Sequence, residues 1–72
     1  MTEKNFYCNF YVKKGDLKNL LDTHDLELSE ISTKGEKFEI WAYADKDVVL
    51  SLQKSDLVHD FMYEDINNSP FW

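Results

Sequence analysis

Residues 26–44 constrain the fold more than any other stretch, because they form two β-rich runs separated by a short turn. The turn is Thr33-Lys34-Gly35-Glu36, in which Gly35 can adopt the positive φ that many hairpin turns need. The run after the turn alternates strictly, with one face made of Phe38, Ile40 and Ala42 and the other of Glu39, Trp41 and Tyr43. Such alternation is typical of a strand with one buried face, so these residues predict an antiparallel β-hairpin.

The run before the turn is less regular. Leu26 and Leu28 share one face, whereas Ile31 falls on the opposite face. A change of parity within a strand indicates a β-bulge, or an edge strand that changes face.

A strand and a short helix are predicted on each side of the hairpin. Residues 6–12 alternate and predict a strand, and residues 57–63 predict another, whose two faces are too similar to orient. Apolar residues three and four apart predict amphipathic helices at 16–23 and 45–54, with N-caps at Asp16 and Asp45. The resulting order predicts an α+β ferredoxin-like βαββαβ sandwich, in which two helices cover one face of a four-stranded antiparallel sheet.

The size and charge of the chain limit its partners. Its 72 residues suffice for one domain, which we assign to residues 1–66, followed by a C-terminal tail at 67–72. The chain has 14 Asp and Glu against eight Lys and no Arg, for a formal net charge of −6. Arg provides the bidentate contacts to phosphate and guanine, and negative charge repels nucleic acids and anionic lipids. We therefore expect no direct nucleic-acid or membrane partner, but another protein.

Chemically reactive side chains are few and scattered. Cys8 falls on the apolar face of the first strand, where a structural role is expected. His24 lies near the end of the first helix, where a cation is favoured. One Cys and two His without paired spacing predict no catalytic residue, no metal site and no cofactor, so we expect that the chain is not an enzyme.

Features of export and membrane insertion are not evident in the sequence. Residues 1–5 lead directly into a strand, and no apolar run approaches the ~20 residues that span a bilayer. A lone Cys cannot form the internal disulfides on which small secreted domains usually depend. We therefore expect a cytoplasmic protein.

Aromatic residues are expected on the face of the sheet that the helices leave open, and these are Tyr7, Tyr11, Trp41 and Tyr43. An exposed aromatic patch usually marks an interface, although cross-strand aromatic pairs also stabilise a sheet. RNA-recognition domains stack bases on such residues, but their glycine-aromatic signature and basic surroundings are missing from this sequence. We predict a protein-binding surface.

A second candidate surface is acidic. Beyond Lys54 the chain carries no basic residue and four acidic ones, Asp56, Asp60, Glu64 and Asp65. Such a run is usually a solvated face, but it can also dock on a basic groove by electrostatic steering. Small phage-type or plasmid-type inhibitors of nucleic-acid enzymes act in this way, by imitating the charge of DNA.

The third candidate is the tail, in which Pro70 precedes Phe71 and Trp72. Two large apolar residues at a chain end either fold back over the domain or insert into a partner. Folding back avoids the exposure of Trp72 to water. Both aromatic residues are nevertheless candidate contacts for a partner.

The segment Asp60-Phe61-Met62-Tyr63-Glu64-Asp65-Ile66 resembles the closing strand of the activation segments (propeptides) of zinc carboxypeptidases, which commonly reads Tyr-x-x-Met-Ile-Glu-Asp-Val. The helix at 16–23, the hairpin and Val48-Val49-x-x-Leu52 follow in matching order. The resemblance covers about residues 6–66 and is one of pattern. It implies a domain that folds alone and inhibits a peptidase by covering its cleft.

Three hypotheses of function follow. The first is an inhibitor or regulator of a peptidase, which contacts its target through the four aromatic residues of the open face and through the tail. The second is an acidic inhibitor of a nucleic-acid-handling enzyme. The third is a structural module that forms a homodimer, sheet to sheet, through the aromatic face.

Overall fold

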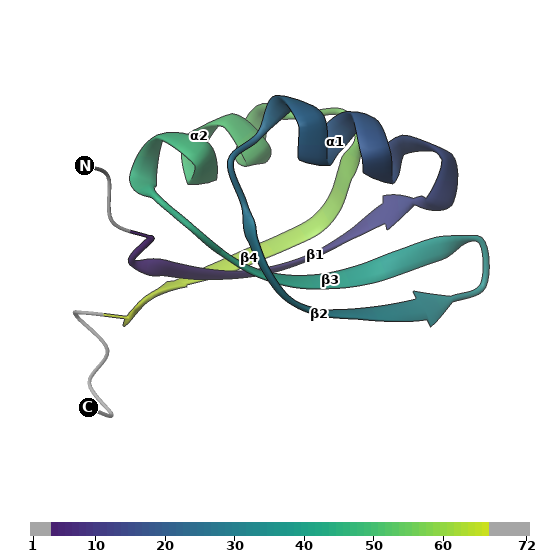
Figure 1. Ribbon diagram of the computed structural model, residues 1–72, viewed down its shortest axis with the longest axis horizontal. Coiled ribbons are helices and arrows are strands. Elements are labelled where there is room, and N and C mark those ends of the chain that lie inside the picture. The colour runs from purple at the N-terminus through teal and green to yellow at the C-terminus, as the bar shows by residue number, and fades with distance from the viewer. Residues whose placement is uncertain (1–3, 67–72) are drawn as a thin grey trace.

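The computed structural model describes residues 4–66, which form one sheet and two α-helices (Figure 1). In chain order the elements are β1 (Phe6–Lys13), the 3-10 turn η1 (Lys14–Asp16), α1 (Leu17–Thr23), β2 (Glu27–Lys34), β3 (Lys37–Ala44), α2 (Lys46–Lys54) and β4 (Val58–Asp65). The strands lie in the order β2-β3-β1-β4, and each neighbouring pair is antiparallel. Figure 1 shows both helices on one side of the sheet and no other described element on the opposite side. The predicted ferredoxin-like fold is confirmed.

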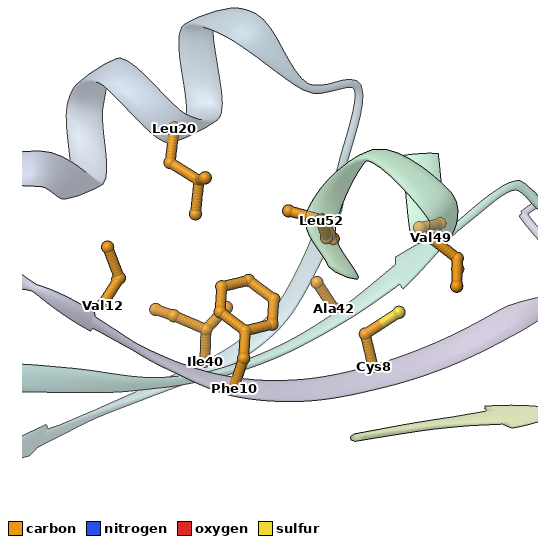
Figure 2. Close-up of a cluster of buried hydrophobic side chains, with 9 residues drawn as sticks. Cys8, Phe10, Val12, Leu20, Ile40, Ala42, Val49 and Leu52 are labelled. Atoms are coloured by element: carbon orange, nitrogen blue, oxygen red, sulfur yellow. The ribbon is translucent and has the colours of Figure 1, made fainter. Parts of the chain in front are cut away.

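The hydrophobic core lies between the sheet and the helices. Its lower layer consists of alternate residues of the two central strands, all fully buried: Cys8, Phe10 and Val12 on β1, and Ile40, Ala42 and Ala44 on β3. Side chains from both helices meet this layer from above, namely Leu20, Val49 and Leu52 (Figure 2). The alternation read from the sequence therefore identifies the buried face of both central strands.

The two helices begin differently. Asp45 at the start of α2 accepts a hydrogen bond from the backbone N–H of Val48 (2.9 Å), and it is only 8% exposed. Asp16 stands at the start of α1 as predicted, but its side chain makes no capping hydrogen bond. The backbone at Asp16 is already helical (φ −99°, ψ −10°), because η1 leads directly into α1, whereas a capping residue is normally extended.

This difference predicts unequal effects when the two carboxylates are removed. Asp45→Ala should lower the free energy of unfolding by about 1 kcal/mol, because it removes a capping hydrogen bond. Asp16→Ala removes no such bond and should change it by less than about 0.5 kcal/mol. Urea denaturation of both variants measures the difference, and equal losses would show that Asp16 also caps its helix in solution.

A two-residue loop, Gly35-Glu36, joins β2 to β3. Gly35 has a φ of 63°, and glycine at the first of two loop positions is the preference of the type II′ hairpin turn. The predicted hairpin and the positive φ of Gly35 are confirmed, but the loop is shorter than predicted, because Thr33 and Lys34 pair with β3 as part of β2. The backbone N–H of Lys14 donates to the carbonyl oxygen of Glu36 (3.2 Å), so the end of β1 lies beside this turn.

A bulge in edge strand β2 explains the parity change in its sequence. The pairing of β2 with β3 shifts register between Leu28 and Glu30. The shift places Leu28 opposite Ala42 and leaves Ile31 opposite Ile40. Both partners on β3 face the helices, so Leu28 and Ile31 share the helix side despite their opposite parity. Both parts of the expectation, a bulge and an edge position, are confirmed.

A second bulge lies in β4, the other edge strand, at Asp60. Its φ of 53° is in the left-handed region, and the pairing with β1 shifts register at this point. Val58 faces the helices before the bulge, and Phe61 and Tyr63 do so after it. The open face receives His59, Met62 and Glu64. Neither simple parity describes this strand, which is why its buried face could not be assigned from the sequence.

Candidate protein-binding surface

The open face of the sheet consists of four rows of side chains, because the strand pairings fix which residues lie side by side. From β2 across to β4, the first row, the Tyr7 row, is Glu27, Tyr43, Tyr7 and Glu64. The second, the Trp41 row, is Glu30, Trp41, Asn9 and Met62. The third, the Tyr11 row, is Ser32, Glu39, Tyr11 and His59. The fourth, the lysine row, is Lys34, Lys37 and Lys13.

All four predicted aromatic residues lie on this face, but they do not form one cluster. The rings of Tyr7 and Tyr43 pair across the central strands, with 5.0 Å between centroids and 47° between planes. Trp41 lies opposite Asn9, and Tyr11 lies opposite Glu39. Aromatic and polar side chains therefore alternate on the open face of β1, whereas β3 carries Tyr43 and Trp41 towards one end and Glu39 and Lys37 towards the other.

An open depression of about 280 Å³ lies at the aromatic end of this face. Its walls are formed by Tyr7, Asn9, Trp41, Met62, Tyr63 and Glu64. Met62 is 65% exposed, which is the largest exposure among the large hydrophobic residues that the structure describes. Met and aromatic residues are enriched in the cores of protein–protein interfaces, so this depression suits an apolar side chain of a partner.

Glu39 organises the polar centre of the face. Its carboxylate accepts a hydrogen bond from the side-chain amide of Asn9 (3.2 Å), lies 4.0 Å from Nζ of Lys34, and is only 15% exposed. Burial raises the pKa of Tyr11, and the adjacent Glu39, which accepts its hydrogen bond, raises it further, as does Asp60. Tyr11 and Glu39 therefore lie side by side at the centre of the surface.

Two contributors to this surface, Asn9 and Met62, were not predicted from the sequence. Asn9 fell on the correct face by parity but was not selected, because an Asn in a strand carries no binding signal of its own. Met62 was missed because the bulge at Asp60 decides which way it points, and a residue with positive φ leaves no pattern in the sequence.

The acidic residues of the second candidate surface are spread over different parts of the molecule. Glu64 belongs to the open face, whereas Asp65 pairs with Phe6 on the helix side. Asp60 is exposed at the bulge, and Asp56 is exposed between α2 and β4. Asp60 and Glu64 are four residues apart on one strand, which is about 13 Å at ~3.3 Å per residue. The third candidate, the tail with Phe71 and Trp72, lies outside the described residues.

The reactive side chains have structural surroundings. His24 Nδ1 lies 3.1 Å from the carbonyl oxygen of Leu20 at the end of α1, and Nε2 lies 3.0 Å from Oγ of Ser51 on α2. The ring therefore links the two helices, and it lies at the end of α1 as predicted. Cys8 is fully buried, and burial raises the pKa of its thiol to about 11, so the thiol is protonated at neutral pH.

The described residues offer neither a metal site nor a membrane-spanning helix. Between residues 4 and 66, no three His, Cys, Asp or Glu side chains gather closely enough to hold a metal ion. In this range, neither helix has the length and apolar character needed to cross a lipid bilayer.

Comparison with known proteins adds no relative. No protein-family model matches the sequence, and no curated protein or solved structure is significantly similar to it. Of the resemblance to carboxypeptidase activation segments, the structure supports the βαββαβ topology with its four-stranded antiparallel sheet.

Proposed function

We propose that the chain is a small, non-catalytic protein-binding module that regulates or inhibits another protein through the open face of its sheet. The observation that carries this proposal is the depression beside Tyr7 and Trp41, rimmed by the 65%-exposed Met62 on a face that no described element covers. Exposed apolar surface of this kind is uncommon on a monomer unless a partner uses it.

The charge of this face also suits a protein partner. Its rows contain four Glu and three Lys, so it is almost balanced, although the chain as a whole carries −6. Charge is depleted in the cores of protein interfaces and tolerated at their rims. The charged side chains here lie mostly at the ends of the rows and of the face, around the aromatic residues.

A peptidase is the target class that we propose first, and this choice rests on the resemblance of residues 60–66 to the closing strand of carboxypeptidase activation segments. In this function the open face would lie against the enzyme near its cleft. The acidic alternative, an inhibitor of a nucleic-acid enzyme, rests on the net charge of −6 and on exposed Asp56 and Asp60.

Capture from a lysate of the source cells tests the proposal, with tagged wild-type chain and two variants. Trp41→Ala removes the largest aromatic side chain of the open face, and Leu50→Ala removes a 45%-exposed apolar side chain from α2, on the other side of the sheet. Truncating a central aromatic contact typically costs at least about 2 kcal/mol, or roughly thirtyfold in affinity. We expect Trp41→Ala to lose the captured protein and Leu50→Ala to retain it.

The identity and salt dependence of the captured protein separate the target classes. A peptidase retained at high salt supports an apolar contact over its cleft. A nucleic-acid enzyme released by salt or by added DNA supports the acidic alternative, because exposed charge pairs are screened. Equal capture by wild type and both variants would show that the open face is not the binding surface.

A further inference from the structure

Charge on the open face is ordered along the strands. One end carries the lysine row, in which Lys13 and Lys34 flank Lys37. The other end carries the Tyr7 row, in which Glu27 and Glu64 flank the paired rings of Tyr7 and Tyr43. The face is therefore positive at the end with the lysine row and negative at the end with the Tyr7 row. Turned end for end, each charged row of one copy would meet the oppositely charged row of another.

Two copies can stack open face to open face about a two-fold axis in two orientations. If the axis runs along the strands, each lysine row lies over the other lysine row, and like charges repel. If the axis runs across the strands, each lysine row lies over the Tyr7 row of the other copy, and opposite charges meet. The second arrangement also keeps the strands of the two sheets nearly aligned, which is the common way for sheets to pack.

We propose that the partner of the open face is a second copy of this chain, bound with its strands antiparallel to those of the first about a two-fold axis that crosses the strands. This inference rests on the part of the proposed function that makes the open face a protein-binding surface. One face cannot hold a second copy and another protein at once, so a target protein would have to displace the second copy. Lys34 of one copy then lies near Glu27 of the second copy. Lys13 lies near the ring of Tyr7 and near Glu64 of the second copy, and a Lys ammonium is attracted to both an aromatic ring and a carboxylate.

The edge strands of the sheet are poorly suited to pairing with another copy, so association through the open face is favoured. Both edge strands carry a β-bulge, between Leu28 and Glu30 in β2 and at Asp60 in β4. Bulges at sheet edges prevent another strand from adding to the sheet. The open face is the uncovered surface that remains in the described part of the chain for sheet-based association.

The area of the face limits the strength of the dimer. Four strands about 4.8 Å apart and eight residues rising about 3.3 Å each give a footprint of roughly 500 Å². Standard specific interfaces bury about 800 Å² per partner. We therefore expect a reversible dimer with a dissociation constant that is roughly micromolar or weaker.

Sedimentation equilibrium from about 0.1 µM to about 1 mM, which spans this range of dissociation constants, tests the proposal. The mass of the wild-type chain should rise with concentration from 8.6 kDa towards twice that value. Two variants test the charge pattern. Glu27→Lys with Glu64→Lys makes both ends of the face positive, and Lys13→Glu with Lys34→Glu makes both ends negative. Each variant alone should remain a monomer, whereas an equimolar mixture should recover the dimer, since each substituted side chain then meets an oppositely charged end of the other copy.

Matched controls carry the same changes of net charge on the other side of the sheet. Asp22→Lys with Asp56→Lys and Lys46→Glu with Lys54→Glu alter exposed residues outside the four rows, and both should dimerise within about threefold of wild type, since surface charges far from an interface contribute little. Circular dichroism confirms that each variant is folded before its mass is measured.

Three outcomes overturn the dimer. The first is a wild-type mass of 8.6 kDa at every concentration. The second is self-association of either face variant as tight as that of wild type. The third is a mixture of the two face variants that stays monomeric while the wild type dimerises. A monomeric wild type whose lysate partner is lost in Trp41→Ala would overturn the dimer alone and leave the proposed function standing.

Discussion

Replacing Phe10 with Ala is expected to lower the free energy of unfolding by about 3–5 kcal/mol, the usual cost of truncating a buried Phe. Phe10 is fully buried at the centre of β1, and its ring lies 6.0 Å from that of Phe61 on the neighbouring strand. It lies beneath both helices, beside Ile40 and Leu52 (Figure 2). Small domains are often stable by only about 5 kcal/mol, so the variant should keep at most about 2 kcal/mol and be partly unfolded at 25 °C.

Tyr11 is the matched control for Phe10, because it is the next residue on the same strand and points to the open face. Tyr11→Ala should lower the free energy of unfolding far less, because this side chain lies on the open face and takes no part in the core. Urea denaturation at a protein concentration well below the dissociation constant of the proposed dimer measures both losses. A similar loss for the two variants would mean that the monomer buries both faces of its sheet, and the open face would then not be a free surface.

Much of this fold could be predicted because the two central strands alternate without interruption. Every helix-side residue is apolar from Cys8 to Val12 in β1 and from Phe38 to Ala42 in β3. The two-residue period alone therefore identifies the buried face. The hairpin turn was equally clear, because Gly35 supplies the positive φ that the two-residue loop requires. Local preferences and burial agree in these elements, and sequence reasoning succeeds where they agree.

The edge strands were less predictable because each depends on a bulge. In β2 the bulge could be inferred from the sequence, because Ile31 is apolar but has the parity opposite to that of Leu26 and Leu28. In β4 the bulge could not be inferred, because apolar and polar residues occur in both parities. The sequence around Asp60 also does not indicate its left-handed backbone. The faces of Met62 and Phe61 could therefore come only from the pairing with β1.

The candidate surface shows the same limit. Its aromatic residues were found, because they lie on the two regular strands. Its lysine row was not found, because Lys13 is 21 residues from Lys34 in the chain, and only strand pairing brings them to one end of the sheet. Lys34 and Lys37 could have been paired in advance, since they flank the two-residue loop of the hairpin.

Cys8 should make the protein less stable at alkaline pH, by as much as about 3 kcal/mol between pH 9 and 11. Burial raises the pKa of the folded thiol to about 11 from an ordinary value of 9.0. Below pH 9 the thiol is neutral in both states and has no effect on the pH dependence. Above pH 9 the thiol ionises in the unfolded chain first, and this ionisation stabilises the unfolded state relative to the folded one. The free energy of unfolding therefore falls until the folded thiol ionises as well.

Tyr and Lys side chains also lose protons in this range, so the effect of Cys8 has to be isolated by comparison with Cys8→Ala. This variant should be less stable than wild type at pH 8, because it loses a buried side chain, and the difference between the two should shrink as the pH rises to 11. Urea denaturation of both proteins across this range measures it. A difference that stays constant would mean that the thiol ionises equally easily in the folded and unfolded chains, and therefore that water reaches it between the sheet and the helices.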